Sequence, residues 1–140
     1  MQLLRSLAPG LTVLVLACSE PTSAGIASSV TGSWETRFAA PGSGFWMTLA
    51  NDGSSLSGSG IVLVEAGDGG YSTIEGGVDR TVVTLDFTPL KENPDGAATV
   101  GGHFTGRLEW GELRGTMQFN GPSSTDTVPI VFVRKTLTPI

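Results

Sequence analysis

The amino-acid sequence predicts an all-β domain, an eight-stranded antiparallel up-and-down barrel, and three observations support this fold. Glycine accounts for 20 of the 140 residues, about twice its usual share of ~7%. Apolar and polar residues alternate along several segments, which is typical of strands with one buried and one exposed face. The connections between these segments are mostly short, as an antiparallel meander requires. A two-sheet β-sandwich is the alternative arrangement.

Eight segments have the composition of strands and are separated by turn signals. They cover residues 31–38, 44–51, 54–64, 71–79, 81–88, 100–110, 112–120 and 127–135. Asn51-Asp52-Gly53 and the glycine-rich run at 67–70 predict hairpins, and Gly111 predicts a tight turn. Residues 89–99 form the one long connection before the end of the chain.

The alternation is clearest between residues 100 and 120. One face of the first strand there is expected to carry Phe104, Gly106, Leu108 and Trp110. The opposite face would carry His103, in contact with solvent. Glycines inside strands, such as Gly115, supply the bends that a small barrel needs. Closing the sheet also removes exposed strand edges, so the pattern favours a barrel.

The N-terminal segment has a different composition. Arg5 precedes an apolar run at 7–16, and the small residue Ala17 stands before Cys18. These are the three parts of a secretory signal peptide. The apolar run is shorter than the roughly 20 residues that a membrane-spanning helix needs. We therefore expect residues 1–17 to be a signal peptide.

Cys18 is the only cysteine of the chain. The stretch VLAC at 15–18 resembles the lipobox of bacterial lipoproteins, in which the cysteine is acylated, with palmitate among the acyl chains, and becomes the new N-terminus. The resemblance implies a lipid anchor in the bacterial cell envelope and, because Ser19 is not acidic, in the outer membrane. Several acyl chains together give stable anchoring. The alternative is an ordinary signal peptide with a chance cysteine near its end.

Residues 18–30 are rich in Ser, Ala and Gly. This composition is typical of flexible linkers, so we expect a lipidated N-terminus followed by a flexible tether. The folded domain would then comprise residues 31–136.

The segment TGSWETRF at 31–38 is similar to the first strand of the calycin barrels, the lipocalins and avidins. Those families place a glycine two residues before a tryptophan that closes the base of the barrel, as Gly32 and Trp34 would here. An arginine late in the last strand often packs on that tryptophan in lipocalins, and the resemblance implies this role for Arg134. The mature region also resembles small glycine-rich lipoproteins of uncharacterised function.

Charge and motifs argue against several classes of function. The net charge is −5 and no basic stripe exists, which argues against nucleic-acid binding. His103, the only histidine, has no acid and nucleophile among its sequence neighbours, as a general base would require. The Asp-Gly stretches at 51–55 and 66–70 are explained by hairpin turns better than by calcium loops. We therefore expect no enzymatic activity, no metal and no cofactor.

Two hypotheses remain for a non-enzymatic protein. A small hydrophobic ligand could bind inside the barrel, with a lining formed by Trp34, Trp46, Met47, Phe104, Leu108 and Met117. Alternatively, side chains fill the barrel, and the domain is an inhibitor or envelope assembly accessory that acts through loops 89–99 or 120–127. The expected partners are therefore a membrane, reached through the lipid, and either a small hydrophobic ligand or an envelope protein.

Overall fold

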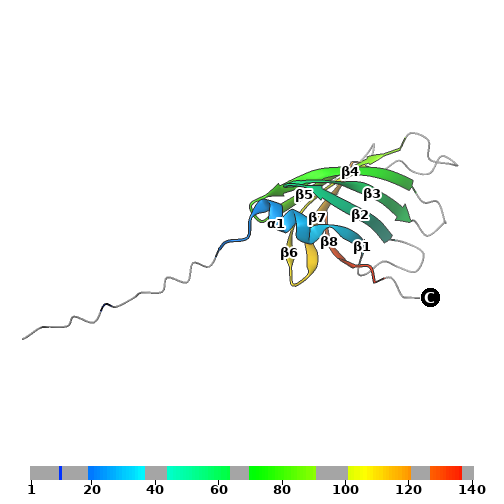
Figure 1. Ribbon diagram of the computed structural model, residues 1–140. Helices are drawn as coiled ribbons and strands as arrows, with labels where there is room; N and C mark the ends of the chain where they lie inside the picture. Colours follow the sequence, from blue (N-terminus) through cyan, green and yellow to red (C-terminus); the bar gives the residue numbers. More distant parts are fainter. Residues whose placement is uncertain are drawn as a thin grey trace, which may run out of the picture.

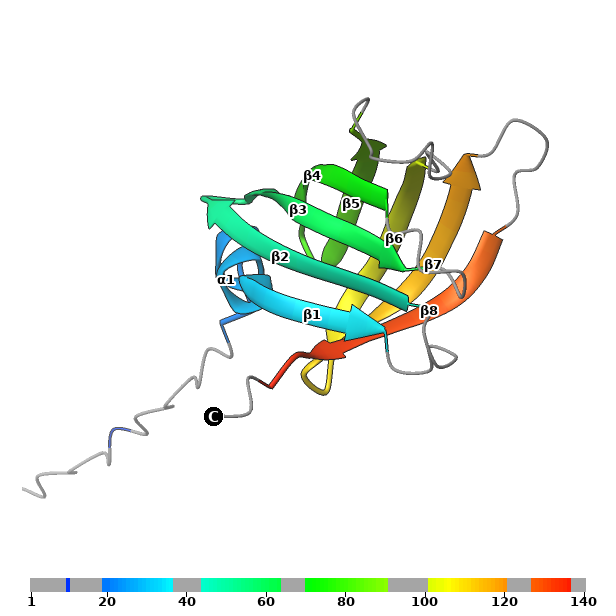
Figure 2. The ribbon, with the colours of Figure 1, turned by 90° about the vertical axis from the view of Figure 1, so that its right-hand side faces the viewer.

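The protein is a closed barrel of eight antiparallel strands, as seen in the computed structural model (Figures 1 and 2). The elements are α1 (Ser23–Val30), β1 (Gly32–Thr36), β2 (Gly44–Asp52), β3 (Ser55–Leu63), β4 (Gly70–Asp79), β5 (Val82–Pro89), β6 (Gly101–Glu109), β7 (Glu112–Asn120) and β8 (Thr127–Arg134). The structure describes residue 10 and residues 19–36, 44–63, 70–90, 101–120 and 127–136.

Each strand pairs with its neighbours in the sequence, and β1 pairs with β8 to close the barrel. The closing register places Trp34 opposite Arg134 and Thr36 opposite Phe132. The predicted barrel is therefore confirmed, and the sandwich alternative is wrong.

The alternation along the strands decides which side chains fill the barrel. In β5, Val83, Leu85 and Phe87 are buried, whereas Asp86 between them is exposed. The same period of two holds in β4 and in most of β6, because successive side chains of a strand point to opposite faces. Burying each such apolar side chain stabilises the fold by roughly 1.5–3 kcal/mol.

The barrel hairpins that the structure describes turn at one end, between β2 and β3, between β4 and β5, and between β6 and β7 (Figure 1). Gly53 follows β2 with a φ of 59°, which confirms the turn expected at residues 51–53. The turn expected at Gly111 is also confirmed, and it consists of Trp110 and Gly111 with φ of 54° and 76°. The glycine-rich run at 67–69 and most of the long connection at 89–99 lie outside the described residues.

Trp110 does not continue the inward face of β6. The strand ends at Glu109, so Trp110 belongs to the turn, where its side chain is 97% exposed. The prediction that Trp110 shares a face with Phe104 is wrong, because a turn does not keep the alternation of a strand.

Gly106 and Gly115 form a cross-strand pair of β6 and β7. A Cβ on Gly115 would collide with the carbonyl oxygen of Thr105 and would lie 2.6 Å from the Cα of Gly106. Only glycine lets the two backbones approach this closely, as expected for a bend in a small barrel.

Residues 23–30 form the helix α1, so the prediction of a flexible tether over all of 18–30 is wrong for this segment. Thr22 caps the helix, and its hydroxyl accepts a 3.0 Å hydrogen bond from the backbone N–H of Gly25. Ile26, Ala27 and Val30 are buried and belong to the same hydrophobic core as the barrel. This apolar face covers one end of the barrel, and its burial outweighs the weak helix propensity of the serine- and glycine-rich segment.

No helix in the part of the chain that the structure describes has the length and apolar character to cross a membrane.

Candidate functional site

The side chains proposed to line an internal cavity mostly pack into the core. Trp34, Met47, Phe104 and Met117 are buried, and Leu108 is half-buried against the same cluster. These side chains point into the barrel, as predicted, but they pack against one another instead of lining a cavity.

Aromatic rings fill the centre of the barrel. Phe45 on β2 stacks against Phe119 on β7, with ring centroids 5.8 Å apart, although these strands are not neighbours in the sheet. Phe45 also meets Phe87 on β5 and Phe132 on β8, at 5.9 and 6.4 Å. Phe132 in turn meets Phe104 at 5.5 Å. Such contacts between opposite walls span the barrel at the level of these rings.

Trp46 is the exception among the predicted lining residues, because it lies on the outer wall with 41% of its surface exposed. Met47, the next residue, is buried, and adjacent residues of a strand point to opposite faces. The prediction that both side chains face the interior is therefore wrong for Trp46.

Trp46 borders a shallow groove of about 270 Å³ on the outer wall formed by β1–β4. The outward side chains that line it are Ser33, Trp46, Thr48, Ser59, Ile61, Tyr71 and Lys135. All of them except Lys135 form two adjacent cross-strand rows. Trp46, Ile61 and Tyr71 are aligned by the pairing of β2, β3 and β4.

The second row consists of hydroxyl groups. Ser33 pairs with Thr48, and Thr48 pairs with Ser59 across β1, β2 and β3. The hydroxyls of Ser33 and Thr48 lie 3.2 Å apart and form a hydrogen bond. The groove therefore has an apolar strip beside a strip of hydrogen-bonding groups.

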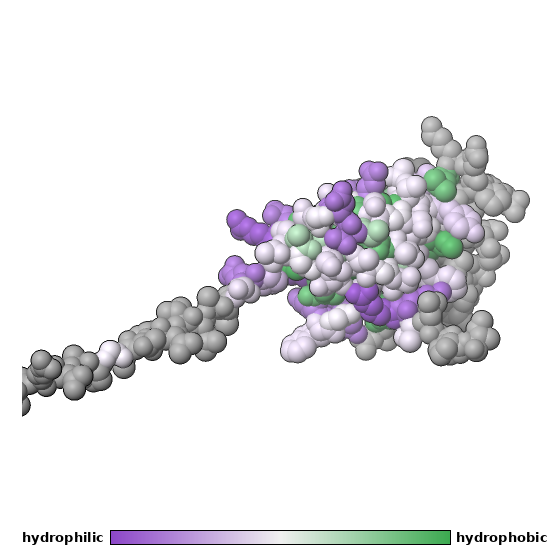
Figure 3. Space-filling model, in the orientation of Figure 1, coloured by the Kyte–Doolittle hydropathy of each residue, from purple (hydrophilic) through white to green (hydrophobic). Residues whose placement is uncertain are grey.

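A cation stands at the edge of this groove. The Nζ of Lys135 lies 3.6 Å from the centre of the Trp46 ring, a cation–π contact. The backbone N–H of Lys135 donates a 3.0 Å hydrogen bond to the carbonyl of Ser33, which holds the residue after β8 against β1. Figure 3 shows this side of the barrel. The apolar residues, drawn in green, form small separate groups among hydrophilic residues, drawn in purple.

Gly32, Trp34 and Arg134 form the predicted contact at the base of the barrel. The guanidinium carbon of Arg134 lies 4.3 Å from the centre of the buried Trp34 ring. The guanidinium also donates hydrogen bonds to the carbonyls of Ser29 and Thr31, the latter of 2.6 Å. The Trp34 indole N–H donates to the carbonyl of Val30 at 2.8 Å. The predicted stacking of Arg134 on Trp34 is therefore confirmed, and it connects the barrel to α1.

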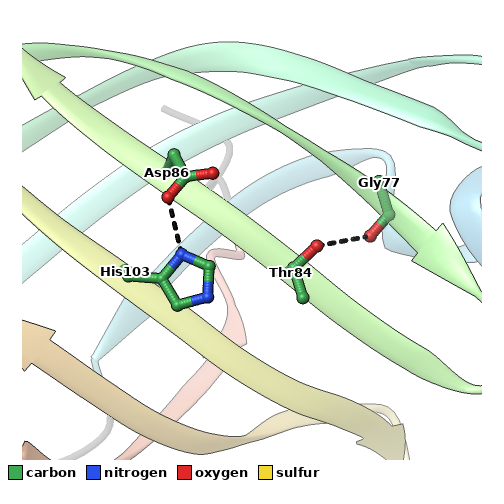
Figure 4. Close-up of polar contacts among 4 residues, drawn as sticks. All are labelled: Gly77, Thr84, Asp86 and His103. Atoms are coloured by element: carbon green, nitrogen blue, oxygen red, sulfur yellow. Dashed lines mark hydrogen bonds and ion pairs between the residues drawn. The ribbon is translucent and has the colours of Figure 1, made fainter.

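His103 has an acidic partner that its sequence neighbours did not reveal. Its Nδ1 lies 2.6 Å from Oδ1 of Asp86, which faces it across the β5–β6 pair on the outer wall (Figure 4). Both side chains are exposed to solvent. The residue opposite His103 on β7 is Gln118, which is not a nucleophile, so the pair has the geometry of a surface hydrogen bond.

Metal-ligating side chains do not cluster within the described ranges, where no group of three or more His, Cys, Asp or Glu residues could hold a metal ion. Cys18, the proposed lipidation site, lies outside the described residues.

Comparisons of the chain with protein-family models, curated proteins and solved structures found no match. The resemblances to lipoproteins and to calycins therefore stay predictions.

Proposed function

We propose that the protein is a bacterial cell-envelope lipoprotein, held at the outer membrane by an acylated Cys18, with a filled barrel that serves as a non-enzymatic interaction module. The signal-peptide pattern before Cys18 and the position of this single cysteine support the anchor. Acylation at one cysteine would hold the domain at a membrane without any spanning segment.

The packed interior supports binding through the outer surface. The stacking of Phe45 on Phe119 across the barrel, at 5.8 Å, is the observation that carries this choice. A ligand at the level of these rings would have to separate them and to displace buried neighbours such as Phe132. Displacing well-packed core side chains is costly, so an internal hydrophobic ligand is the second candidate.

The groove beside Trp46 is the contact surface that we assign to this module. Exposed tryptophan and tyrosine side chains are enriched where proteins bind each other, and Trp46 and Tyr71 border the groove at 41% and 48% exposure. The ammonium group of Lys135 over Trp46 would favour a partner segment that carries a carboxylate next to an apolar side chain. Loops 89–99 and 120–127, which the sequence suggested for the same purpose, lie largely outside the described residues.

Site-specific photo-crosslinking in cells tests this assignment. A photoreactive amino acid replaces Trp46 in one variant and Thr116 in a control, because Thr116 is exposed on β7, away from the groove. We expect a discrete crosslinked envelope protein from position 46, reduced by the further substitution Lys135→Glu and absent at position 116. Equal adducts at both positions, or none at 46, would contradict the groove as contact surface.

Native mass spectrometry separates the two candidates. The Cys18→Ser chain, exported and purified without detergent, should have the mass of the bare polypeptide. A retained small molecule that is lost on denaturation would favour an internal ligand instead, and Met117→Trp should then abolish its binding, because Met117 is buried in the barrel.

A further inference from the structure

The turn between β6 and β7 carries the most exposed large apolar side chain among the described residues. Trp110 is 97% exposed, more than twice the exposure of Trp46 on the wall. Its backbone is left-handed, with a φ of 54°, a conformation that bulky residues disfavour. Hairpin turns of this kind normally take Asn or Gly at such positions. Trp110 neither packs in the core nor suits the turn, so stability does not account for it.

Trp110 lies at the end of the barrel that α1 covers. The β2–β3, β4–β5 and β6–β7 turns all lie at this end (Figures 1 and 2). The first residue of α1 is fastened here, because the backbone N–H of Arg80 in the β4–β5 turn donates a 2.8 Å hydrogen bond to the hydroxyl of Ser23. The N-terminus of the helix and the Trp110 turn therefore leave the barrel on the same side.

Because α1 is docked on the barrel, only a short stretch of chain separates Cys18 from the end of the barrel. Cys18 precedes Ser23 by five residues, and five extended residues span at most about 17 Å. A coil running to residue 30 would let the barrel tumble freely, whereas α1, held by Ile26, Ala27 and Val30, fixes the end of the tether to the barrel. With Cys18 at a bilayer, the end of the barrel that carries Trp110 must stay close to the lipid.

We propose that the Trp110 turn is a second membrane contact, in which the indole inserts into the lipid interface while the acylated Cys18 anchors the chain. This inference rests on the lipid anchor of the proposed function. Tryptophan is suited to the interface because its ring is apolar and its N–H can still bond to water or headgroups. Insertion would orient the barrel, with the ends of β3 and β5 directed away from the bilayer.

The charges around the turn indicate the kind of lipid. Glu109 and Glu112 flank Trp110 and Gly111 and face each other across the hairpin. Arg114 forms an ion pair of 2.5 Å with Glu112, which partly neutralises the site. Arg107 pairs with Arg114 in the same hairpin, so two arginines balance the two glutamates and the turn has no net attraction to anionic headgroups. The contact should therefore form on zwitterionic lipid.

Vesicle partitioning of a singly acylated chain tests the contact directly. The chain from Cys18 onward contains α1 and the whole barrel, and its only thiol can be coupled to one palmitoyl-maleimide. A single chain of this kind binds membranes only marginally, so an added contact becomes measurable. We expect Trp110→Ser to lower partitioning into phosphatidylcholine vesicles roughly tenfold, as the loss of one buried aromatic side chain would.

Trp46→Ser is the matched control, because it removes a tryptophan from the side wall rather than from the α1 end. It should leave partitioning unchanged. In a second measurement, brominated lipids should quench the tryptophan emission of the Trp46→Phe chain, which keeps Trp110. They should not quench the emission of the Trp46→Phe, Trp110→Ser chain. Equal partitioning of the Trp110→Ser and unsubstituted chains would overturn the inference. Dimerisation that depends on Trp110, seen by sedimentation without vesicles, would also overturn it in favour of a second copy as the occupant.

Because the acyl chain is attached chemically, the test does not depend on acylation in the cell. Loss of partitioning in Trp110→Ser alongside a free Cys18 thiol in the cell would refute the lipid anchor and leave the Trp110 contact standing. Acylation of Cys18 without any effect of Trp110→Ser on partitioning would support the lipid anchor and refute the Trp110 contact.

Discussion

Gly32 lies at the base of the barrel, where one added methyl group would disturb the contact between Arg134 and Trp34. Its φ is +127°, a conformation that only glycine adopts without strain, and a Cβ there would lie 2.6 Å from Nη1 of Arg134. The end of the arginine side chain can move away, so the collision itself costs little. Moving it disturbs its stacking on Trp34 and its hydrogen bonds to the carbonyls of Ser29 and Thr31.

The magnitude of the effect of Gly32→Ala follows from these contacts. The strained backbone costs about 2 kcal/mol. Loss of the cation–π contact adds about 0.5–1 kcal/mol, and weakening one hydrogen bond from a charged donor adds about 1.5 kcal/mol. We therefore expect Gly32→Ala to lower the free energy of unfolding by about 4 kcal/mol. For a domain of this size the melting temperature should fall by about 15 °C or more.

A double-mutant cycle with Arg134→Ala separates the two causes. In the Arg134→Ala background only the backbone strain remains, so Gly32→Ala should then cost about 2 kcal/mol. Urea unfolding followed by tryptophan fluorescence gives the four free energies, because Trp34 is buried next to both sites. A cost of Gly32→Ala below about 0.5 kcal/mol, or an equal cost with and without Arg134, would refute this account of the base.

Three further predictions concern α1, the ring cluster and the exposed turn. Val30→Asp should destabilise the domain by about 3 kcal/mol or more, since it buries a charge. Ser28→Asp, on the exposed side of α1, should change stability by less than about 0.5 kcal/mol. Equal effects of the two substitutions in urea unfolding would mean that the helix is not docked. Phe45→Ala should cost about 2–3 kcal/mol, below the value for a fully buried ring, and should leave near-UV circular dichroism altered; an unchanged unfolding midpoint would contradict the filled barrel. Trp110→Asn should raise stability by roughly 0.5–1 kcal/mol, because asparagine tolerates the left-handed turn. The same substitution should lower vesicle partitioning. A loss of stability would show that the indole supports the fold.

The strands could be predicted closely because period-two alternation and turn glycines are local signals. Leu85 and Phe87 alternate with Asp86 over a whole strand, and Gly111 ends a hairpin. Most predicted strand limits therefore lie within one or two residues of the observed ones. The stacking of Arg134 on Trp34 could be proposed only through the resemblance to calycins, since nothing local connects the first strand to the last.

The errors have equally specific causes. The composition of α1 is typical of a linker and so does not predict a helix, although Thr22 can cap one and Ile26, Ala27 and Val30 share one helical face. Trp46 cannot face inward together with Met47, because adjacent residues of a strand point to opposite faces and Met47 is buried. These two features were within reach of the sequence.

The remaining site features depend on register, which no single strand encodes. Asp86 meets His103 only because β5 and β6 pair with that particular offset. The groove likewise appears only once Trp46, Ile61 and Tyr71 are aligned across three strands. Pairing offsets are set jointly by turns and by the packing of the whole barrel, so these contacts could not be read from the chain.

The central claim is that Cys18 anchors a filled barrel to a membrane, and the intact mass of the protein recovered from cells tests it most directly. The protein should be recovered from the outer-membrane fraction as a chain that begins at Cys18 and carries acyl chains on that residue, and Cys18→Ser should move it to the soluble fraction. A soluble chain with a free thiol at Cys18, or one cleaved after Cys18, would contradict the claim.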